Sequence, residues 1–350
     1  MARSIIPPYL LARLASSGTD RFPTASRAAQ RTLRIDAPRR SARLDLSIDG
    51  DALVVELSDA PDREISDAEN REELPGRLVR TEGDDPTGDV AADEAYEGLG
   101  ATFDLFSQQF DRNSIDGLGM RLRATVHYGE LYDNAFWDGE RMVFGDGDGE
   151  VFAGFTSSLS VIGHELAHGV IQHTAGLEYV GQSGALNESI ADVFGALVEQ
   201  HVRGESAAQA TWLIGEGLFT DEVQGRALRS LRAPGTAYDD DTLGRDPQPA
   251  HMRDFIVTSE DNGGVHLNSG IPNHAFFLLA DALGGAAWEL AGRIWYDALT
   301  SQLPATADFA TFAAATVRTA SARYGEVSTE VDAVRAAWDG VGVTTDGGGS

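Results

Sequence analysis

The stretch VIGHELAHGV, residues 161–170, restricts the fold of this chain more than any other segment. His164 and His168 are four residues apart, so on an α-helix their imidazoles leave the same face, about 40° apart and one turn along. The surrounding residues are apolar and predict a buried helix, where a polar group without a partner is costly. Such a pair suits a tetrahedral zinc ion, with Glu165 able to reach a bound water without being a ligand. The simpler alternative is two polar residues that occur by chance on an amphipathic helix.

A second helix, predicted over residues 183–200 in SGALNESIADVFGALVEQ, supplies carboxylates with the same spacing. Glu188 and Asp192 are four residues apart, so one can bind a metal while the other accepts an imidazole N–H. Either residue alone is also explained by a solvated face or by the favourable interaction of carboxylates with a helix N-terminus. Beside the two histidines, the pair favours a metal site closed by two antiparallel helices.

The composition limits what else the chain can do. It contains no Cys, so a metal must be held by His, Asp and Glu. The net charge of −28 disfavours duplex nucleic acid as a partner, and no segment reaches the ~18 apolar residues that a membrane span needs. Residues 1–50 carry nine Arg and four Asp, so a basic arm precedes an acidic body. From charge alone we expect this arm to be a solvated tail.

The first part of the chain has no pattern of a packed domain. Residues 15–43 are typical of a short helix or loop, and residues 43–57 of a hairpin that turns at Asp49 and Gly50. The charged, Pro-containing segment 58–76 is typical of a connector between domains.

Farther along, the patterns predict an α+β organisation with a helical second half. Residues 93–110 have helical spacing, and the segments LRATVHYG and RMVFG are typical of strands. GDGDGEV, residues 145–151, lacks the spacing of an EF-hand calcium loop and predicts a tight turn. We expect two helices within 157–202 and several more within 270–340.

Several separated motifs closely resemble the thermolysin-like metalloproteases. HELAH is followed after 19 residues by Glu188 in GALNESIAD, and NAFW at 134–137 and NGGVHLNSG at 262–270 occur in the matching order. The resemblance runs from about Leu74 to about Val341. The opening SIIPPYLL is similar to the N-terminal pro-segment of the protealysin-like branch of that family.

The resemblance implies a two-lobed thermolysin-like zincin, with a strand-containing N-terminal lobe, a helical C-terminal lobe and the zinc site between them. It divides the chain into residues 1–62 as pro-segment and linker, 63–182 as the N-terminal catalytic lobe with the HExxH helix, and 183–350 as the helical C-terminal lobe with a flexible tail.

The resemblance also implies a role for each matching residue. His164, His168 and Glu188 would bind zinc, while Asn187 and Asp192 would hold the two imidazoles. Glu165 would be the general base and proton shuttle. The tetrahedral intermediate would receive hydrogen bonds from His266 and Tyr179, and Asp261 would keep His266 charged. Because His266 lies in a turn-rich stretch, we expect it to be exposed.

Substrate binding follows from the same resemblance. Asn134 and the backbone of Ala135 would hold the substrate as an added strand, with Arg229 on its carbonyl oxygen at the leaving-group side. The residues that match the pocket beside the scissile bond are all apolar: Phe152, Phe155, Val161, Ile214, Leu218 and Leu228. We therefore expect cleavage before large hydrophobic residues.

The opening segment is expected to fill that apolar cleft. Pro7, Pro8, Tyr9 and Leu10 would form part of a stiff, extended plug that loses little entropy on docking, and the basic arm would then follow the acidic body. Removal between about residues 40 and 75 is our prediction for activation.

A calcium cluster is not expected near the zinc. The positions that match the family's calcium ligands are Ser160, Glu199, Thr211, Leu213 and Glu216, and just two of them keep a carboxylate.

The sequence thus favours a zinc-dependent neutral endopeptidase made as a self-inhibited precursor. The alternatives are a zinc aminopeptidase of the HExxH-Glu type and a catalytically idle zincin-fold binding module. Expected partners are peptide or protein substrates and the chain's own pro-segment; the resemblance also allows a protein inhibitor, and neither nucleic acid nor a membrane is expected. Since Pro7, Pro8 and Arg13 interrupt the apolar run, we expect no secretory signal peptide, and either a cytoplasmic protein or export by another route.

Overall fold

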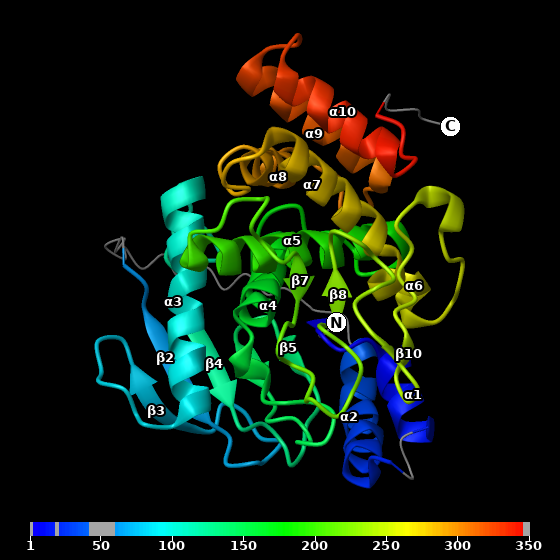
Figure 1. Cartoon of the computed structure of the whole chain (residues 1–350). Helices are drawn as coiled ribbons and strands as arrows, with labels where there is room; N and C mark the ends of the chain where they lie inside the picture. Colours follow the sequence, from blue (N-terminus) through cyan, green and yellow to red (C-terminus); the bar gives the residue numbers. More distant parts are fainter. Residues whose placement is uncertain (1–2, 18–20, 42–59, 346–350) are drawn as a thin grey trace.

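A computed structural model describes residues 3–17, 21–41 and 60–345 of the chain (Figure 1). The N-terminal arm consists of strand β1 (Arg3–Ser4), helix α1 (Pro8–Ser17) and helix α2 (Pro23–Ser41). The extended Pro-Pro frame predicted for the opening segment is therefore wrong beyond Pro7. Proline is favoured in the first turn of a helix, where its missing N–H has no partner to lose, and the carbonyl of Pro7 accepts the first helical hydrogen bonds.

A six-stranded mixed sheet forms the base of the first lobe, in the order β1-β5-β6-β4-β2-β3. Its body strands are β2 (Arg63–Asp67), β3 (Arg77–Thr81), β4 (Leu122–Val126), β5 (Ala135–Trp137) and β6 (Met142–Phe144). Strand β4 pairs in parallel with β2 and β6, and the remaining pairs are antiparallel. The arm's β1 pairs with β5, so it is the edge strand of the sheet.

The sheet corrects the prediction for residues 58–76. This stretch is not simply a connector, because β2 lies inside the sheet between β3 and β4. Its buried residues Ile65 and Ser66 are consecutive and are flanked by charged residues, so the strand lacks the alternating pattern. The predicted strands in LRATVHYG and RMVFG are confirmed as β4 and β6. The predicted hairpin at 43–57 lies outside the described residues.

Three helices position the centre of the molecule. These are α3 (Val90–Phe110), α4 (Leu159–Gln172) and α5 (Gly181–Arg203). Helices α4 and α5 approach closely because two glycines face each other: a Cβ at Gly195 would lie 2.4 Å from the carbonyl oxygen of Ser160, and one at Gly163 would lie 3.1 Å from Gly195 Cα. Farther along, His168 contacts Asn187, so the contacts run in opposite chain directions, as predicted.

The second lobe is helical, which confirms the predicted two-lobed α+β fold. Its further helices are α6 (Asp261–Asn268), α7 (Gly270–Leu283), α8 (Ala291–Thr300), α9 (Phe309–Tyr324) and α10 (Thr329–Gly340). Short strand pairs connect it to α5: β7 (Leu213–Ile214) with β8 (Arg229–Ser230), and β9 (Asp239–Asp240) with β10 (Gly244–Arg245). Figure 1 shows α7 to α10 stacked on the far side of α5 from the sheet.

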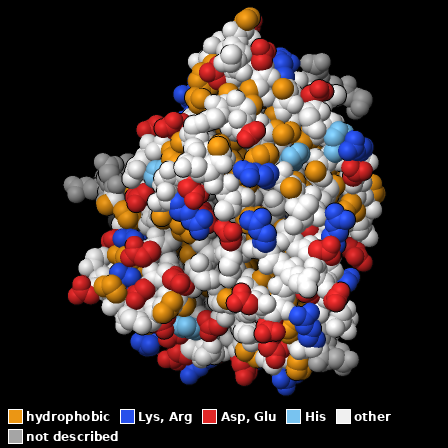
Figure 2. Space-filling model, viewed as in Figure 1, with side chains coloured by type: hydrophobic (Ala, Val, Ile, Leu, Met, Phe, Trp, Pro, Cys, Tyr) orange, Lys and Arg blue, Asp and Glu red, His pale blue; other side chains and the backbone are white. Residues whose placement is uncertain are grey.

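The surface reflects the acidic composition, with carboxylates and Arg side chains spread over both lobes in the view of Figure 2. In the part of the chain that the structure describes, no helix is both long and apolar enough to cross a bilayer.

Candidate active site

The HExxH helix α4 and the following helix α5 bring His164, His168 and Glu188 together. Their potential ligand atoms all lie within 4.8 Å of one another. The Nε2 atom of His164 is 3.6 Å from Oε2 of Glu188, and Nε2 of His168 is 3.4 Å from Oε1 of Glu188. All three side chains are completely buried.

The donor set fits a zinc ion. Nε2 of His164 and Oε2 of Glu188 have no hydrogen-bond partner in the described part of the chain, although buried polar atoms are nearly always hydrogen-bonded. Two imidazoles and a carboxylate that converge in this way are the ligands of a catalytic zinc site with an open fourth position.

The outer nitrogen of each imidazole has a partner on α5. Nδ1 of His168 is 2.8 Å from Oδ1 of Asn187, and Nδ1 of His164 is 2.8 Å from Oδ1 of Asp192. The amide of Asn187 is itself oriented by donating to the carbonyl oxygen of Leu177 at 3.0 Å. Since both acceptors require a proton on Nδ1, each Nε2 lone pair points toward Glu188.

Asp192 stays ionised because two further residues contact it. Arg229 donates two hydrogen bonds of 2.8 Å to its carboxylate, and Asn273 on α7 donates a third of 2.9 Å. Burial alone would raise the pKa of Asp192, but the charges of Arg229 and His164 outweigh it and lower the pKa to about 2. Asn273 was not predicted as a site residue. The one hint in the sequence is that it is the single amide side chain in the apolar segment of residues 270–283.

Glu165 lies on α4 beside the histidines and is fully buried. Its Oε2 accepts a hydrogen bond of 3.0 Å from the backbone N–H of Trp137, the last residue of β5. The NAFW motif therefore places the end of β5 against this carboxylate.

His266 and Tyr179 approach the same site from the second helical lobe and from the loop before α5. Nε2 of His266 lies 3.2 Å from the hydroxyl of Tyr179, which donates to Oε1 of Glu188. Nδ1 of His266 is 2.7 Å from Oδ1 of Asp261. Burial would lower the pKa of His266, but the carboxylates of Asp261 and Glu188 outweigh it and raise the pKa to about 9, so the ring carries a charge at neutral pH.

The prediction that His266 is exposed is wrong. Asn262, Gly263 and Gly264 have φ values of 52°, 87° and 76°, a left-handed bend that glycine adopts readily and that folds Asp261 back onto His266. The N-terminal arm then covers the ring, whose Nε2 lies 3.0 Å from the carbonyl oxygen of Ser4. His266 is 3% exposed as a result.

The opening segment lies in the cleft in an extended conformation. The N–H of Ile5 donates to the carbonyl oxygen of Ala135 at 3.1 Å, and the N–H of Ile6 donates to Oδ1 of Asn134 at 2.9 Å. Arg229 donates to the carbonyl oxygen of Ile5 at 3.0 Å. Both isoleucines are completely buried.

The residues matched to the specificity pocket belong to the same apolar core as Ile5. All are at most 3% exposed: Phe152, Phe155, Val161, Ile214, Leu218 and Leu228. The set is therefore buried in the core that runs through both lobes and that also includes Ile5.

The two arm helices dock onto the body, so the solvated tail expected from charge alone is wrong. Asp36 of α2 is buried and accepts hydrogen bonds from the hydroxyl of Tyr132 at 2.6 Å and from Nδ2 of Asn134 at 2.9 Å. At the other end of α2, the Glu150 carboxylate accepts the backbone N–H groups of Thr24 and Ala25. These contacts were missed because a lone Asp in an Arg-rich helix gives no sequence signal of its partner.

The side chain of Arg203 lies beside the positions that match the family's calcium ligands. Arg203 lies 2.6 Å from the carboxylate of Glu199 and 3.9 Å from that of Glu216. A guanidinium therefore supplies positive charge to the two carboxylates that remain.

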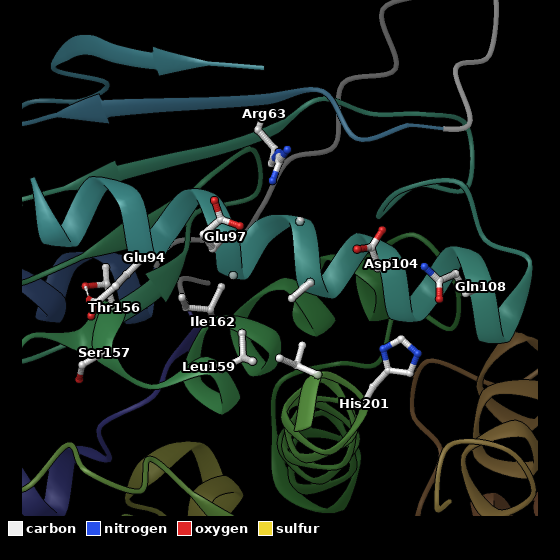
Figure 3. Close-up of a pocket in the computed structure, with 14 residues that line it drawn as sticks. Arg63, Glu94, Glu97, Asp104, Gln108, Thr156, Ser157, Leu159, Ile162 and His201 are labelled. Carbon is white, nitrogen blue, oxygen red and sulfur yellow. Dashed lines mark hydrogen bonds between the residues drawn. The ribbon is translucent and has the colours of Figure 1, made fainter. Parts of the chain in front are cut away.

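A separate cavity of about 560 Å³ lies on the other side of α4. Figure 3 shows it between α3 and the start of α4, with Glu94, Leu159, Ile162 and His201 in its lining. Ile162 and His164 are two residues apart, so their side chains leave α4 about 200° apart. This cavity is therefore not part of the candidate metal site.

Comparison with known proteins agrees with this geometry. Residues 40–172 match the family described as "Thermolysin metallopeptidase, catalytic domain", and residues 175–343 match "Thermolysin metallopeptidase, alpha-helical domain". An "Extracellular metalloprotease" of Pectobacterium carotovorum subsp. carotovorum is 51% identical over 348 residues, which cover 97% of this chain and 96% of that protein. The chain belongs to the thermolysin metallopeptidase family.

Two further relatives of this thermolysin family member are informative. The solved structure described as "Precursor of Protealysin, Metalloproteinase from Serratia proteamaculans" has a TM-score of 0.88 and 53% identity, and the match covers 98% of this chain and 100% of that chain. A "Thermolysin" of Alicyclobacillus acidocaldarius subsp. acidocaldarius is 40% identical over 287 residues, which cover 79% of this chain and 50% of that protein. The family is one of zinc-dependent metalloendopeptidases, and His164, His168 and Glu188 lie close together as the candidate zinc site of this chain.

The relatives also correct the expected location. A cytoplasmic protein is contradicted by the extracellular metalloprotease that shares 51% identity with the chain, a relationship that points to secretion. The interruption of the apolar run by Pro7, Pro8 and Arg13 was therefore an unsound basis for that expectation.

Proposed function

We propose that the chain is the self-inhibited precursor of a neutral zinc endopeptidase that cleaves on the N-terminal side of large hydrophobic residues. The observation that carries this proposal is the seating of Ser4, Ile5 and Ile6 across the candidate active site. Three of their backbone groups pair with Ala135, Asn134 and Arg229, and the carbonyl oxygen of Ser4 lies at His266.

This seating supports a register for the substrate. An extended peptide bound as an added strand would use the same acceptors and donors, with its scissile carbonyl where the Ser4 carbonyl lies, beside His266. The following residue, at the position of Ile5, would enter the apolar region formed by Phe155, Val161 and Leu228. Specificity for a large hydrophobic residue after the scissile bond follows.

The chemical steps are assigned to residues around the carbonyl of Ser4. Glu165 would take a proton from the attacking water and return it to the leaving amine. His266, charged at neutral pH, and Tyr179 would donate hydrogen bonds to the oxygen that gains negative charge, with Asp261 holding the His266 ring. His164, His168 and Glu188 would hold a zinc ion, which would supply Lewis acidity at this site, and Asn187 and Asp192 would fix the orientation of the two imidazoles.

The domain division that we propose follows the same logic. Residues 1–62 are the pro-segment and linker, in which Pro7, Pro8, Tyr9 and Leu10 end the extended plug and begin α1. Residues 63–182 form the N-terminal catalytic lobe, and residues 183–350 form the helical C-terminal lobe. A protein inhibitor of the mature enzyme, which the family resemblance allows, would have to bind in the cleft that the arm now fills.

The test is an intact-mass time course of purified wild-type protein beside Glu165→Ala, each with and without a zinc chelator. We expect wild type to lose an N-terminal piece of about 40 to 75 residues, and both the chelator and the substitution to stop this. Full-length protein in every sample would contradict self-processing.

Peptides blocked at both ends distinguish the alternatives. Cleavage of an internal bond before Leu or Phe excludes an aminopeptidase, which needs a free α-amino group. Stoichiometric zinc binding without any cleavage, after the arm has been removed by another protease, would identify an idle binding module instead.

A further inference from the structure

Two carboxyl groups that the proposed mechanism does not use are buried directly behind the substrate-binding turn. Asp133 precedes Asn134 and is completely buried, and Asp148 in the loop of residues 145–151 is 7% exposed. The two loops are joined by backbone hydrogen bonds, from Gly145 to the carbonyl oxygen of Asn134 at 3.0 Å and from Gly147 to that of Tyr132 at 3.4 Å.

The side chains of the two aspartates face each other. Oδ1 of Asp148 accepts hydrogen bonds from the N–H groups of Glu150 and Val151, at 2.7 and 2.6 Å. Both carboxyl oxygens of Asp133, and Oδ2 of Asp148, are buried without a well-formed hydrogen bond in the described part of the chain. The Asp133 carboxyl interacts with both the backbone N–H and the carboxyl group of Asp148. Two carboxylates that face each other cannot share a hydrogen bond while both are acceptors only, so we expect one of them to carry a proton.

Three other carboxylates near the pair are engaged elsewhere. Asp146 accepts from His127 at 2.9 Å, the Glu150 carboxylate accepts from the first turn of α2, and Asp36 of α2 accepts from Tyr132 and Asn134. Burial raises the pKa of Asp133 well above its usual range, and the charge of Asp148 raises it further. Burial also raises the pKa of Asp148, but its backbone donors and the hydrogen bond from Asp133 oppose that rise. Asp133 is therefore the residue that keeps the proton.

We propose that Asp133 is a protonated acid that donates a hydrogen bond to Asp148, and that this acid pair is the positioning device for the substrate-binding residues Asn134 and Ala135. The Oδ1 of Asn134 accepts from the N–H groups of Ile6 and Ala135, and its Nδ2 donates to Asp36. The Asp133 side chain adds a side-chain link from the turn to the loop of residues 145–151, beside the two backbone hydrogen bonds.

The acid pair has a definite pH dependence. The pKa of Asp133 is higher in the folded than in the unfolded chain, so its contribution to stability is fully present below the unfolded pKa of about 3.9. The contribution is lost as the pH rises through the folded pKa, because the folded state must then hold two facing charges. Replacement of the proton donor by an amide removes this dependence while keeping the hydrogen bond.

Three variants of the full-length chain, each in the Glu165→Ala background to prevent self-cleavage, test the pair. Asp133→Asn keeps a donor toward Asp148, Asp133→Leu keeps the branching at Cγ but has no donor, and Asp138→Asn is the matched control. Like Asp148, Asp138 is a turn carboxylate that accepts backbone N–H groups, those of Glu140 and Arg141. Unlike Asp133, it faces a positive charge, the guanidinium of Arg141 at 3.7 Å.

Two measurements follow that require no turnover. In the infrared spectrum at neutral pH, the C=O stretch of a protonated carboxylic acid should be present in the background protein and in Asp138→Asn, and absent from Asp133→Asn. The Tm of Asp133→Asn relative to the background should rise by about 2 to 4 °C between about pH 5 and about pH 9, whereas Asp133→Leu should have a lowered Tm throughout. No acid band at neutral pH, or parallel Tm curves for the background and Asp133→Asn, would overturn the acid pair.

The positioning role rests on the proposed function and has its own readout. In the mature enzyme, Asp133→Leu should raise KM for blocked peptides about 10-fold or more with a smaller change in kcat, and Asp133→Asn should restore KM. An unchanged KM in Asp133→Leu would overturn the positioning role. A mature enzyme without activity would instead contradict the proposed function, while the infrared and thermal results would still decide on the acid pair.

Discussion

The metal centre and the N-terminal arm occupy the same cleft but are bound into the molecule in different ways. The metal centre consists of side chains on two helices that are buried on every side, with charges paired at 2.8 Å. The arm is bound by a short strand, by buried apolar side chains such as Ile5 and Leu11, by a few buried polar contacts and by partly exposed ion pairs such as that of Arg31 with Glu130. Exposed ion pairs contribute little to stability. We therefore expect the metal centre to be a permanent part of the fold and the arm, which adds an edge strand and two helices to it, to be removable.

The largest expected effect comes from breaking the permanent region at a metal ligand. His168→Ala should lower bound zinc from about one ion per chain to nearly none and reduce peptidase activity more than about 1,000-fold. Zinc analysis and cleavage of a blocked peptide measure this. His173→Ala, which alters an exposed histidine at the end of the same helix, is the control and should change neither. Normal activity in a zinc-free His168→Ala protein would refute the assignment.

The next effect is expected where the two regions meet, at Arg229. Arg229→Met leaves the buried carboxylate of Asp192 without its guanidinium, and loss of one partner of a buried ion pair costs about 3 to 5 kcal/mol. Urea unfolding in the Glu165→Ala background measures this change. Arg323→Met, which breaks the more exposed pair with Asp297, should cost less than about 1 kcal/mol. Equal losses in the two variants would mean that Arg229 is not a structural element of the centre.

A smaller effect is expected within the arm. Asp36→Ala removes the carboxylate that accepts from Tyr132 and Asn134 in a buried site, and such charge-assisted hydrogen bonds are worth about 1.5 to 3 kcal/mol. The arm should dissociate more readily. In a chain that keeps Glu165, Asp36→Ala should therefore speed the proteolytic loss of the arm about 10-fold or more relative to wild type. Intact-mass spectrometry gives the rate, and Arg31→Ala, at an exposed ion pair, should differ little from wild type. If Asp36→Ala is processed no faster, the arm is held by other contacts.

The smallest effect concerns a histidine that links the body's own elements and touches neither region. His127 lies between Asp146 and Asp89, at 2.9 and 3.0 Å, and its hydrogen bond to Asp146 raises its pKa to about 9 despite partial burial. Its contribution to stability is thus fully present below the usual pKa of about 6.5 and is lost as the pH rises through about 9. The Tm advantage of the Glu165→Ala protein over the same protein with His127→Gln should shrink across that range. A constant difference would show that the charge on His127 contributes nothing.

The sequence predicted the metal centre far better than the arm, for a physical reason. The side chains of a ligand site on a helix are placed by their spacing within one segment. The four-residue intervals of His164–His168 and Glu188–Asp192 each put two side chains on one helix face, which restricted how they could meet. Apolar surroundings also predicted that these helices would be buried. The partner of the second imidazole, Asn187, followed from the motif, whereas Asn273 did not, because it belongs to a helix whose own pattern is simply apolar.

The structure of the arm was predicted in part. Its apolar opening indicated that it covers an apolar surface, but it did not indicate which backbone conformation it adopts. Ile5 and Ile6 lie in the cleft, yet Pro8 begins a helix and does not extend the plug. Asp36 and Glu150 were missed because their partners are far away in sequence, about 100 residues or more. The exposure of His266 was predicted wrongly because its cover, Ser4, comes from the opposite end of the chain.

Strand β1 is the outermost strand of the six-stranded sheet, with β5 next to it. While the arm is attached, a short strand of the chain's own covers the hydrogen-bonding edge of β5. Once the arm is gone, β5 becomes an open edge beside an apolar floor, and uncovered edges of this kind readily template pairing between chains. We therefore expect the mature enzyme to aggregate more readily than the precursor, unless an extended peptide occupies the edge of β5.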